Sequence, residues 1–133
     1  MSALTLLTIL TDLILEKTTP KITAVIEDEA GTPVPGTSLL TLTLTLYSTS
    51  DSPAYAIIND RSDQDVLNAE GVTVDAEGNL AWQTASADTA IQDSVLEKET
   101  HRAVFKWTYA SGSNTIVGAH IIDMTIQNLE KVL

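Results

Sequence analysis

Residues 40–47 read LTLTLTLY, a strict alternation of apolar and polar side chains. A period of two places successive side chains on opposite faces of a β-strand, whereas a helix repeats every 3.6 residues. One face of this predicted strand carries threonines and a tyrosine, and the other carries four leucines: Leu40, Leu42, Leu44 and Leu46. β-Branched threonine on a solvated face is typical of antiparallel pairing. The stretch therefore predicts an antiparallel strand with its leucines toward a core.

The same period recurs on both sides of this stretch. Turn residues separate the segments: DEAGTPVPG at 28–36, AEGN at 76–79 and SGSN at 111–114. The further predicted strands are residues 21–27, 54–58, 72–75, 80–83, 101–109 and 115–126. Residues 84–100 have no clean period, so we expect a long connection there, with a helical turn near residues 89–95. About seven strands without βαβ spacing predict an all-β, antiparallel β-sandwich.

Residues 2–16 have a different period. Thr5, Thr8, Asp12 and Glu16 fall on one side of a helix, and apolar residues recur on the other at three- and four-residue spacing: Ala3, Leu6, Leu7, Leu10, Leu13 and Ile14. This spacing, with Ser2 as N-cap and Pro20 beyond the end, predicts a short N-terminal α-helix. We therefore expect an amphipathic helix over residues 1–18 and a sandwich domain over residues 19–133. The apolar stripe must be buried, either on the sandwich itself or on a partner.

The composition of the chain argues against some classes of binding partner. The chain has 133 residues, enough for one domain, and a net charge of −11 from 7 basic and 18 acidic side chains. Nucleic acids and anionic membranes are bound through Lys and Arg, so we expect neither as a partner. The absence of cysteine excludes disulfides and cysteine nucleophiles. Lys17 is the first basic residue and Asp12 interrupts the apolar N-terminus, so neither a signal peptide nor a membrane span is predicted.

Motifs for catalysis and for cofactor binding are absent from the sequence. There is no G-x-S-x-G elbow, no phosphate-binding glycine loop and no H-x-x-x-H pair. His101 and His120 lie in predicted strands and are interpreted as structural. Residues 59–65 (NDRSDQD) crowd oxygen ligands, but Arg61 interrupts them and no glycine marks a calcium loop, so a capped turn is favoured over a Ca²⁺ site. We therefore expect no enzyme activity, no cofactor and no metal.

Two further groups of residues leave alternatives open. Asp88 with Asp93, or Glu97 with Glu99, could form an acid–base pair, but solvated surface is the favoured interpretation. Aromatic residues at alternating strand positions are more often core than a sugar-binding platform. The residues in question are Trp82, Phe105, Trp107 and Tyr109.

Residues 42–109 resemble small structural proteins of tailed bacteriophage virions. The resemblance rests on TLTLY (43–47), IINDRSDQDVLNAEGVTVDAEGNLAWQ (57–83), ASADTAI (85–91) and EKETHRAVFKWTY (97–109), and IQNLEKV (126–132) fits the same pattern. It extends over roughly residues 21–133 and includes no catalytic motif. It implies an immunoglobulin-like sandwich, of about seven strands, incorporated into a virion.

The resemblance also implies a function. We expect a capsid decoration (cement) protein, located on the capsid surface, that forms a homotrimer and binds the major capsid protein. The expected oligomer or capsid interface is the apolar stripe Leu6, Leu7, Leu10, Leu13 and Ile14. The alternatives are a tail, neck or baseplate component and a carbohydrate- or receptor-binding module.

Overall fold

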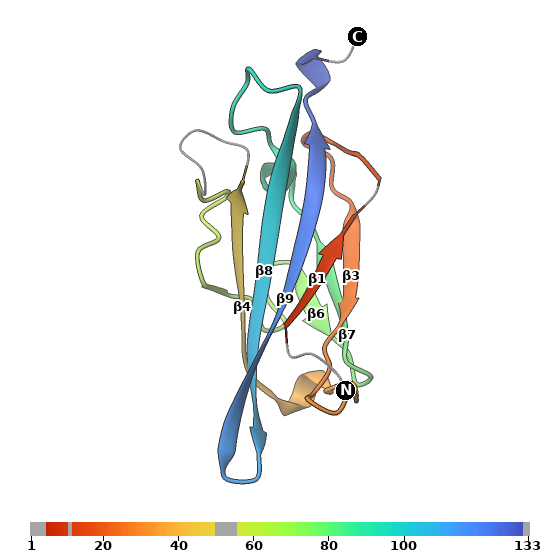
Figure 1. Ribbon diagram of the computed structural model, residues 1–133, viewed down its shortest axis with the longest axis vertical. Helices are drawn as coiled ribbons and strands as arrows, with labels where there is room; N and C mark the ends of the chain where they lie inside the picture. Colours follow the sequence, from red (N-terminus) through yellow and green to blue (C-terminus); the bar gives the residue numbers. More distant parts are fainter. Residues whose placement is uncertain (1–4, 11, 50–55, 132–133) are drawn as a thin grey trace.

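The computed structural model describes residues 5–10, 12–49 and 56–131, whose strands form two sheets (Figure 1). The larger sheet contains, in spatial order, β1 (Thr5–Ile9), β9 (Asn114–Gln127), β8 (Lys98–Ser111), β4 (Leu39–Ser48) and β5 (Gln64–Asp65), and β2 (Ile14–Leu15) also pairs with β9. The smaller sheet contains β3 (Lys21–Val25), β7 (Asn79–Gln83) and β6 (Val72–Val74). The prediction of an all-β sandwich is confirmed. The described residues form nine strands, against the seven or so expected.

The predicted N-terminal helix is wrong. Thr5–Ile9 and Ile14–Leu15 are strands that pair in parallel with β9, and Ser2, the expected N-cap, lies outside the described residues. β8 pairs with one edge of β9, and β1 pairs with the other edge. This second pairing gives hydrogen-bond partners to backbone N–H and C=O groups of β9 that β8 does not reach. The segment is also rich in β-branched Thr and Ile, which favour strands. Tertiary pairing therefore overrides the helical spacing, and this segment belongs to the sandwich sheet.

The leucine strand is confirmed with one change of register. Leu42, Leu44 and Leu46 are fully buried, but Leu40 is 55% exposed. The register of β4 against β8 shifts between Leu39 and Thr41, which is a β-bulge. Leu39 therefore takes the inward position predicted for Leu40, because one extra residue reverses the direction of every side chain on one side of it.

Most of the other predicted strands are present, but their first and last residues differ from those predicted. The hairpin at 76–79 is confirmed by the pairing of β6 with β7, and the one at 111–114 by the pairing of β8 with β9. Of predicted strand 54–58, residues 54 and 55 lie outside the described residues, and Ile57 forms only an isolated bridge with Tyr47. The helical turn expected at 89–95 occurs instead as a 3-10 turn at Ser86–Thr89. Two more 3-10 turns are Gly36–Ser38 and Leu129–Lys131.

The long hairpin of β8 and β9 is the central element of the larger sheet. It runs the full length of Figure 1, and its tip projects beyond the other strands. Its inner side chains belong to the core, as do those of the smaller sheet. The twelve largest fully buried side chains are Trp82, Trp107, Phe105, Ile26, Leu42, Leu44, Leu46, Ile58, Leu80, Ile122, Met124 and Ile126.

The four candidate sugar-platform aromatics lie in this core. Trp82, Phe105 and Trp107 are at most 1% exposed, and Tyr109 is 6% exposed. Trp82 meets Phe105 edge to face, with ring centroids 5.6 Å apart. The favoured interpretation of these residues as core is confirmed, and they do not form a platform for sugars.

Gly118 makes room for one of these rings. It lies directly across from Trp107 in the β8–β9 ladder, and a Cβ atom at Gly118 would lie 2.6 Å from the indole Cε2 and Nε1 atoms. Because a well-packed core resists added volume, Gly118→Ala is expected to lower the free energy of unfolding by about 1–3 kcal/mol in urea titrations. Adding Trp107→Phe, which shrinks the opposing ring, should recover part of the loss due to alanine at position 118. If the two substitutions were simply additive, this steric account would be wrong.

Candidate functional site

The predicted interface residues lie along the N-terminal border of the larger sheet. Ile14 is buried in the core, Leu10 is half-buried against it, and Leu13 is 49% exposed. Leu6 and Leu7 belong to β1, but their side chains lie outside the described part of the structure. The stripe is therefore divided between core and surface, since the segment is extended and not helical.

Exposed apolar side chains nevertheless collect along this border. Ile9 is 66% exposed and Leu15 is 47% exposed; both lie in strands that pair with β9, and Leu13 lies in the connection between these strands. We call Ile9, Leu13 and Leu15 the N-terminal edge. A groove of about 310 Å³ runs beside it between the two sheets. Ile9, Leu10, Asp12, Ile14, Pro20, Lys21 and Ile22 line this groove.

A second candidate surface is the outer face of the larger sheet, opposite the core. Three cross-strand rows form it, each with one residue from β4, one from β8 and one from β9. We call it the threonine face. Its rows are Thr41–Thr108–Val117, Thr43–Lys106–Ala119 and Thr45–Val104–Ile121. These side chains are half-buried or exposed, and Val117 is 60% exposed.

Charges on and beside the threonine face occur in opposite pairs. Lys106 Nζ lies 3.1 Å from Asp63 Oδ1, and the hydrogen bond from Lys106 holds the pKa of Asp63 below its ordinary value. In the next row Arg102 donates two hydrogen bonds to Asp123, at 2.7 and 2.9 Å. This pairing, with a smaller contribution from Tyr47, raises the pKa of the Arg102 guanidinium. Exposed Asp65 of β5, opposite Thr43, adds a further negative charge to the middle row, so the face is polar with a small net negative charge.

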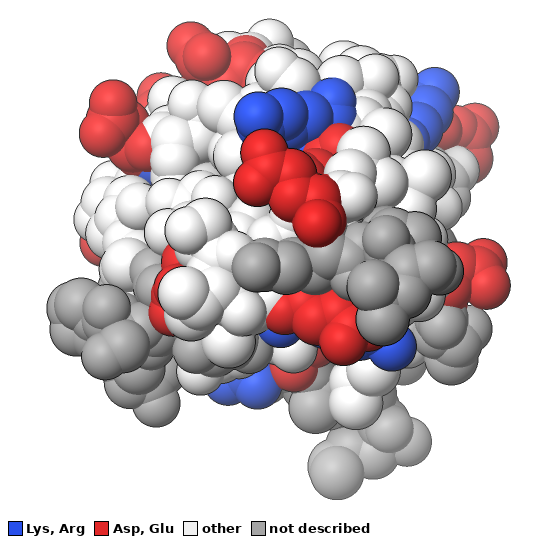
Figure 2. Space-filling model, turned by 90° about the horizontal axis from the view of Figure 1, so that it is seen from above, with Lys and Arg blue, Asp and Glu red and all other residues white. Residues whose placement is uncertain are grey.

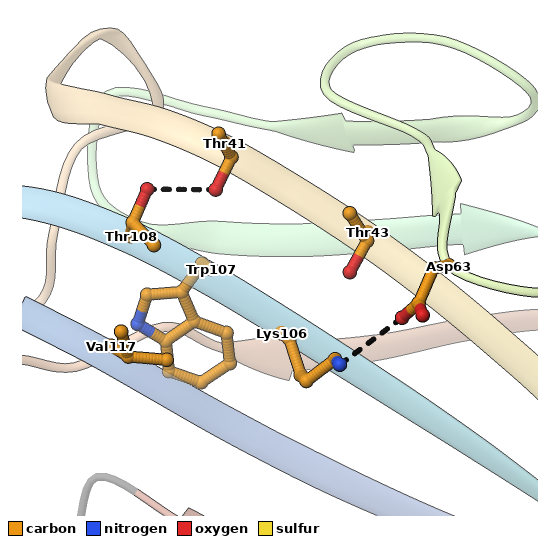
Figure 3. A pocket seen from close by; sticks show the side chains of 7 residues that line it. All are labelled: Thr41, Thr43, Asp63, Lys106, Trp107, Thr108 and Val117. Carbon is orange, nitrogen blue, oxygen red and sulfur yellow. Dashed lines mark hydrogen bonds and ion pairs between the residues drawn. The ribbon is translucent and has the colours of Figure 1, made fainter.

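The threonine face contains a shallow depression of about 230 Å³ (Figure 3). Thr41 and Thr108 meet there through a hydroxyl–hydroxyl hydrogen bond of 2.7 Å. Lys106 and Asp63 form the opposite end, and Val117 rises beside the depression. Sequence reasoning identified these threonines as outward-facing but did not identify the surface. The missing information was the register, which sets the threonines of β4 beside Thr108, Lys106 and Val104 of β8 and one strand away from aliphatic residues of β9.

The predicted capped turn at 59–65 is organised by a buried ion pair. Arg61 donates hydrogen bonds to both carboxylate oxygens of Asp88, at 2.6 and 3.1 Å. Asn59 also donates to Asp88, as does the backbone N–H of Ala85. Arg61 is 4% exposed and Asp88 is fully buried. The interpretation of Asp88 as solvated surface is wrong, because its partner comes from a loop 27 residues earlier.

Glu99 also proves to be buried. Its carboxylate accepts backbone N–H groups of Gln92 and Asp93, at 2.9–3.1 Å, and contacts His101 Nε2. The other ring nitrogen of His101 contacts the Asp88 carbonyl oxygen at 3.1 Å. The interpretation of Glu99 as a solvated surface residue is therefore also wrong, while Glu97 is exposed as expected. His101 has the structural role predicted for it, since it links β8 to the connection at 88–93.

The remaining titratable and metal-binding chemistry is limited. His120 lies on the inner side of β9, and burial lowers its pKa. Within the described residues, no group of three or more His, Asp or Glu side chains is arranged to hold a metal ion. The same part of the chain contains no helix with the length and hydropathy of a membrane span.

No protein-family model matches the chain, and no curated protein is significantly similar to it. Arguments about its function therefore start from its surfaces.

Proposed function

We propose that the chain is a structural protein of a tailed bacteriophage virion, and within the virion a capsid decoration protein. In this role it oligomerises on the surface of the head and stabilises it. The observation that carries the proposal is the N-terminal edge, where Ile9, Leu13 and Leu15 stay exposed although the core behind them is complete. Three exposed apolar side chains within seven residues at one border of a sheet are a candidate protein interface, where such side chains become buried.

The strand order supports the immunoglobulin-like character that the resemblance implies. Immunoglobulin domains pack a sheet with strands B, E and D against one with strands G, F and C, and variable-type domains extend the second sheet with C′. The order β3–β7–β6 corresponds to B–E–D, and β9–β8–β4–β5 corresponds to G–F–C–C′. The fold alone hosts many functions, so the choice among them depends on the surfaces.

A decoration protein acts through many copies, each making modest contacts with a shell. Linked contacts reinforce one another through effective concentration, so no single contact needs to be strong. In this proposal the N-terminal edge and its groove contact either a neighbouring protomer of a homotrimer or the major capsid protein. The buried aromatic residues speak against the carbohydrate-binding alternative, since no sugar reaches them. A structural role, without catalysis, is the function that these surfaces favour.

The test is co-sedimentation of the purified chain with assembled capsids and with free capsid subunits. The wild type is expected to pellet with capsids and not with free subunits. Leu13→Asp combined with Leu15→Asp should weaken capsid binding at least about tenfold, because carboxylates replace apolar contacts in the interface. Point substitutions are preferable to deleting the segment, which would remove β1 and β2 from the sheet.

Leu40→Asp is the matched control. Leu40 is 55% exposed, much like Leu13 and Leu15, but lies at the bulge in β4. It should bind capsids as the wild type does. Equal binding of the wild type to free subunits and to capsids, or equal losses for both variants, would contradict the proposed function of the N-terminal edge.

A further inference from the structure

One edge of the smaller sheet is open along β3, which forms one margin of the molecule (Figure 1). Pro20 accepts a hydrogen bond from Thr84, and Ile26 donates one to Gly78, so the even-numbered residues of this stretch bond on the β7 side. Because an extended chain directs successive backbone groups to opposite sides, the odd-numbered residues point their N–H and C=O groups away from β7. These residues are Lys21, Thr23 and Val25. In the described part of the chain, no strand pairs with them.

The other edge of the same sheet, β6, is closed by its own loop. β6 has three residues, and its Val72 and Val74 N–H groups donate to the Ala69 carbonyl and the Asn68 side chain. Proteins commonly protect exposed edges with such short strands, with bulges or with charges. β3 has five residues in unbroken register with β7, and its one charge, Lys21, lies at its first position. The middle of β3 is therefore open to pairing.

An apolar groove adjoins the first half of this open edge. It is the groove of about 310 Å³ beside the N-terminal edge, and Pro20, Lys21 and Ile22 line it from the β3 side. In paired strands, residues that face each other point to the same side of the sheet. In a strand added beside β3, the side chain opposite Ile22 therefore points toward this groove. A segment with apolar side chains at alternate positions fits both the backbone groups and the groove.

The charge around the edge restricts the segment further. The chain carries a net charge of −11, and Figure 2 shows acidic side chains spread around one end of the molecule, so an acidic partner is repelled. Lys21 is the one charged side chain in β3, β6 and β7. Glu27 follows β3, so the edge has an ammonium group at one end and a carboxylate at the other. An antiparallel strand complements it with a basic side chain near Glu27 and an acidic one near Lys21.

We propose that the open edge of β3 binds an extended segment of a partner polypeptide, which joins the smaller sheet as an antiparallel strand. In such strand addition, main-chain hydrogen bonds supply affinity and pockets for alternate side chains supply specificity. The segment is apolar at alternate positions, basic at its N-terminal end and acidic at its C-terminal end. This inference goes beyond the proposed function, because it holds whether or not the partner belongs to a capsid.

The probe is the synthetic peptide acetyl-Lys-Val-Thr-Val-Thr-Val-Glu-amide. Its three valines lie on the core side of the added strand, its lysine lies opposite Glu27, and its glutamate lies opposite Lys21. The control peptide has the same side chains and carries N-methyl groups on both threonines. Those N–H groups are the ones that point toward β3, so the control loses the hydrogen bonds and keeps the charge and the apolar groups.

The experiment is amide hydrogen exchange of the full chain, followed residue by residue by NMR. Without peptide, the amides of Thr23 and Val25 should exchange fast, while those of Ile22 and Ala24, which bond to β7, exchange slowly. A near-saturating concentration of the probe is expected to slow exchange at Thr23 and Val25 at least about tenfold. The N-methylated control should leave both rates unchanged.

Glu27→Lys tests the charge complementarity. It places a like charge beside the lysine of the probe, so we expect binding to weaken about three- to tenfold. Glu29→Lys is the matched control, because it changes the net charge equally, from −11 to −9, at an exposed position in the turn after the edge. It should bind the probe as the wild type does, and equal losses for the two variants would contradict the proposed orientation of the strand.

Three results would overturn the inference. The first is unchanged exchange at Thr23 and Val25 with up to about 1 mM probe, and the second is equal protection by the N-methylated control. The third is protection without peptide that grows with protein concentration, which would assign the edge to a second copy of the chain. Protection by the probe in a chain that never binds capsids would leave this inference standing and contradict the decoration function.

Discussion

Arg61→Ala is expected to lower the free energy of unfolding by about 3–5 kcal/mol, because it leaves the Asp88 carboxylate buried without its cation. Both side chains are almost fully removed from water, and two hydrogen bonds join them. Asp88 also receives hydrogen bonds from Asn59 and the backbone of Ala85, so it cannot turn toward solvent without breaking them. Urea denaturation at constant pH, followed by circular dichroism, measures the loss.

Arg102→Ala is the control for this prediction. Arg102 forms an equally short two-point pair with Asp123, but it is 33% exposed and Asp123 is 14% exposed. Water can solvate the Asp123 carboxylate that remains after the truncation. We therefore expect the free energy of unfolding to fall by at most about 1 kcal/mol. Similar losses for Arg61→Ala and Arg102→Ala would show that burial of the Arg61 pair does not carry the effect.

Trp82→Ala is expected to lower the free energy of unfolding by about 3–5 kcal/mol, because it opens a cavity where β7 faces the larger sheet. Trp82 is fully buried, its ring meets Phe105 edge to face, and the Arg61 guanidinium carbon lies 5.8 Å from its centroid. The substitution thus removes contacts from both sheets and from the Arg61 loop. The same urea titration measures it, and a loss below about 1 kcal/mol would contradict the central place of this ring in the core.

The variant Trp82→Phe distinguishes the effect of ring volume on stability from the effect of the indole N–H. Among the described residues, Nε1 of Trp82 has no hydrogen-bond partner, so phenylalanine gives up no hydrogen bond there. We expect Trp82→Phe to retain more than half of the stability that Trp82→Ala loses, since most of the aromatic packing stays. Equal losses for the two variants would mean that the edge contact with Phe105 depends on the larger ring.

The strands that the sequence predicts well are those with a strict period of two. Leu42, Leu44 and Leu46 are buried as expected, and so are Ile122, Met124 and Ile126. The position of Leu40 could not be predicted, because a bulge depends on the partner strand. The N-terminal helix was predicted on local spacing alone, and pairing with β9, more than 100 residues away, decided against it.

The candidate site was less predictable than the fold. Of the five predicted interface residues, Leu13 is exposed at the N-terminal edge, while Ile14 belongs to the core. Buried Asp88 and Glu99 escaped prediction, because their burial depends on partners that only the folded chain brings near. The threonine face combines residues from three strands, so its composition emerges only from the register.

Localisation on the particle tests the central proposal most directly. Antibody-gold labelling or cryo-electron microscopy of the virions to which the proposal assigns this chain would locate each copy. The account predicts many copies on the outer surface of the head, with the N-terminal edge turned toward the shell or toward a neighbouring copy. Copies confined to the neck, tail or baseplate would contradict the decoration function, and absence from purified virions would contradict a structural role in the particle.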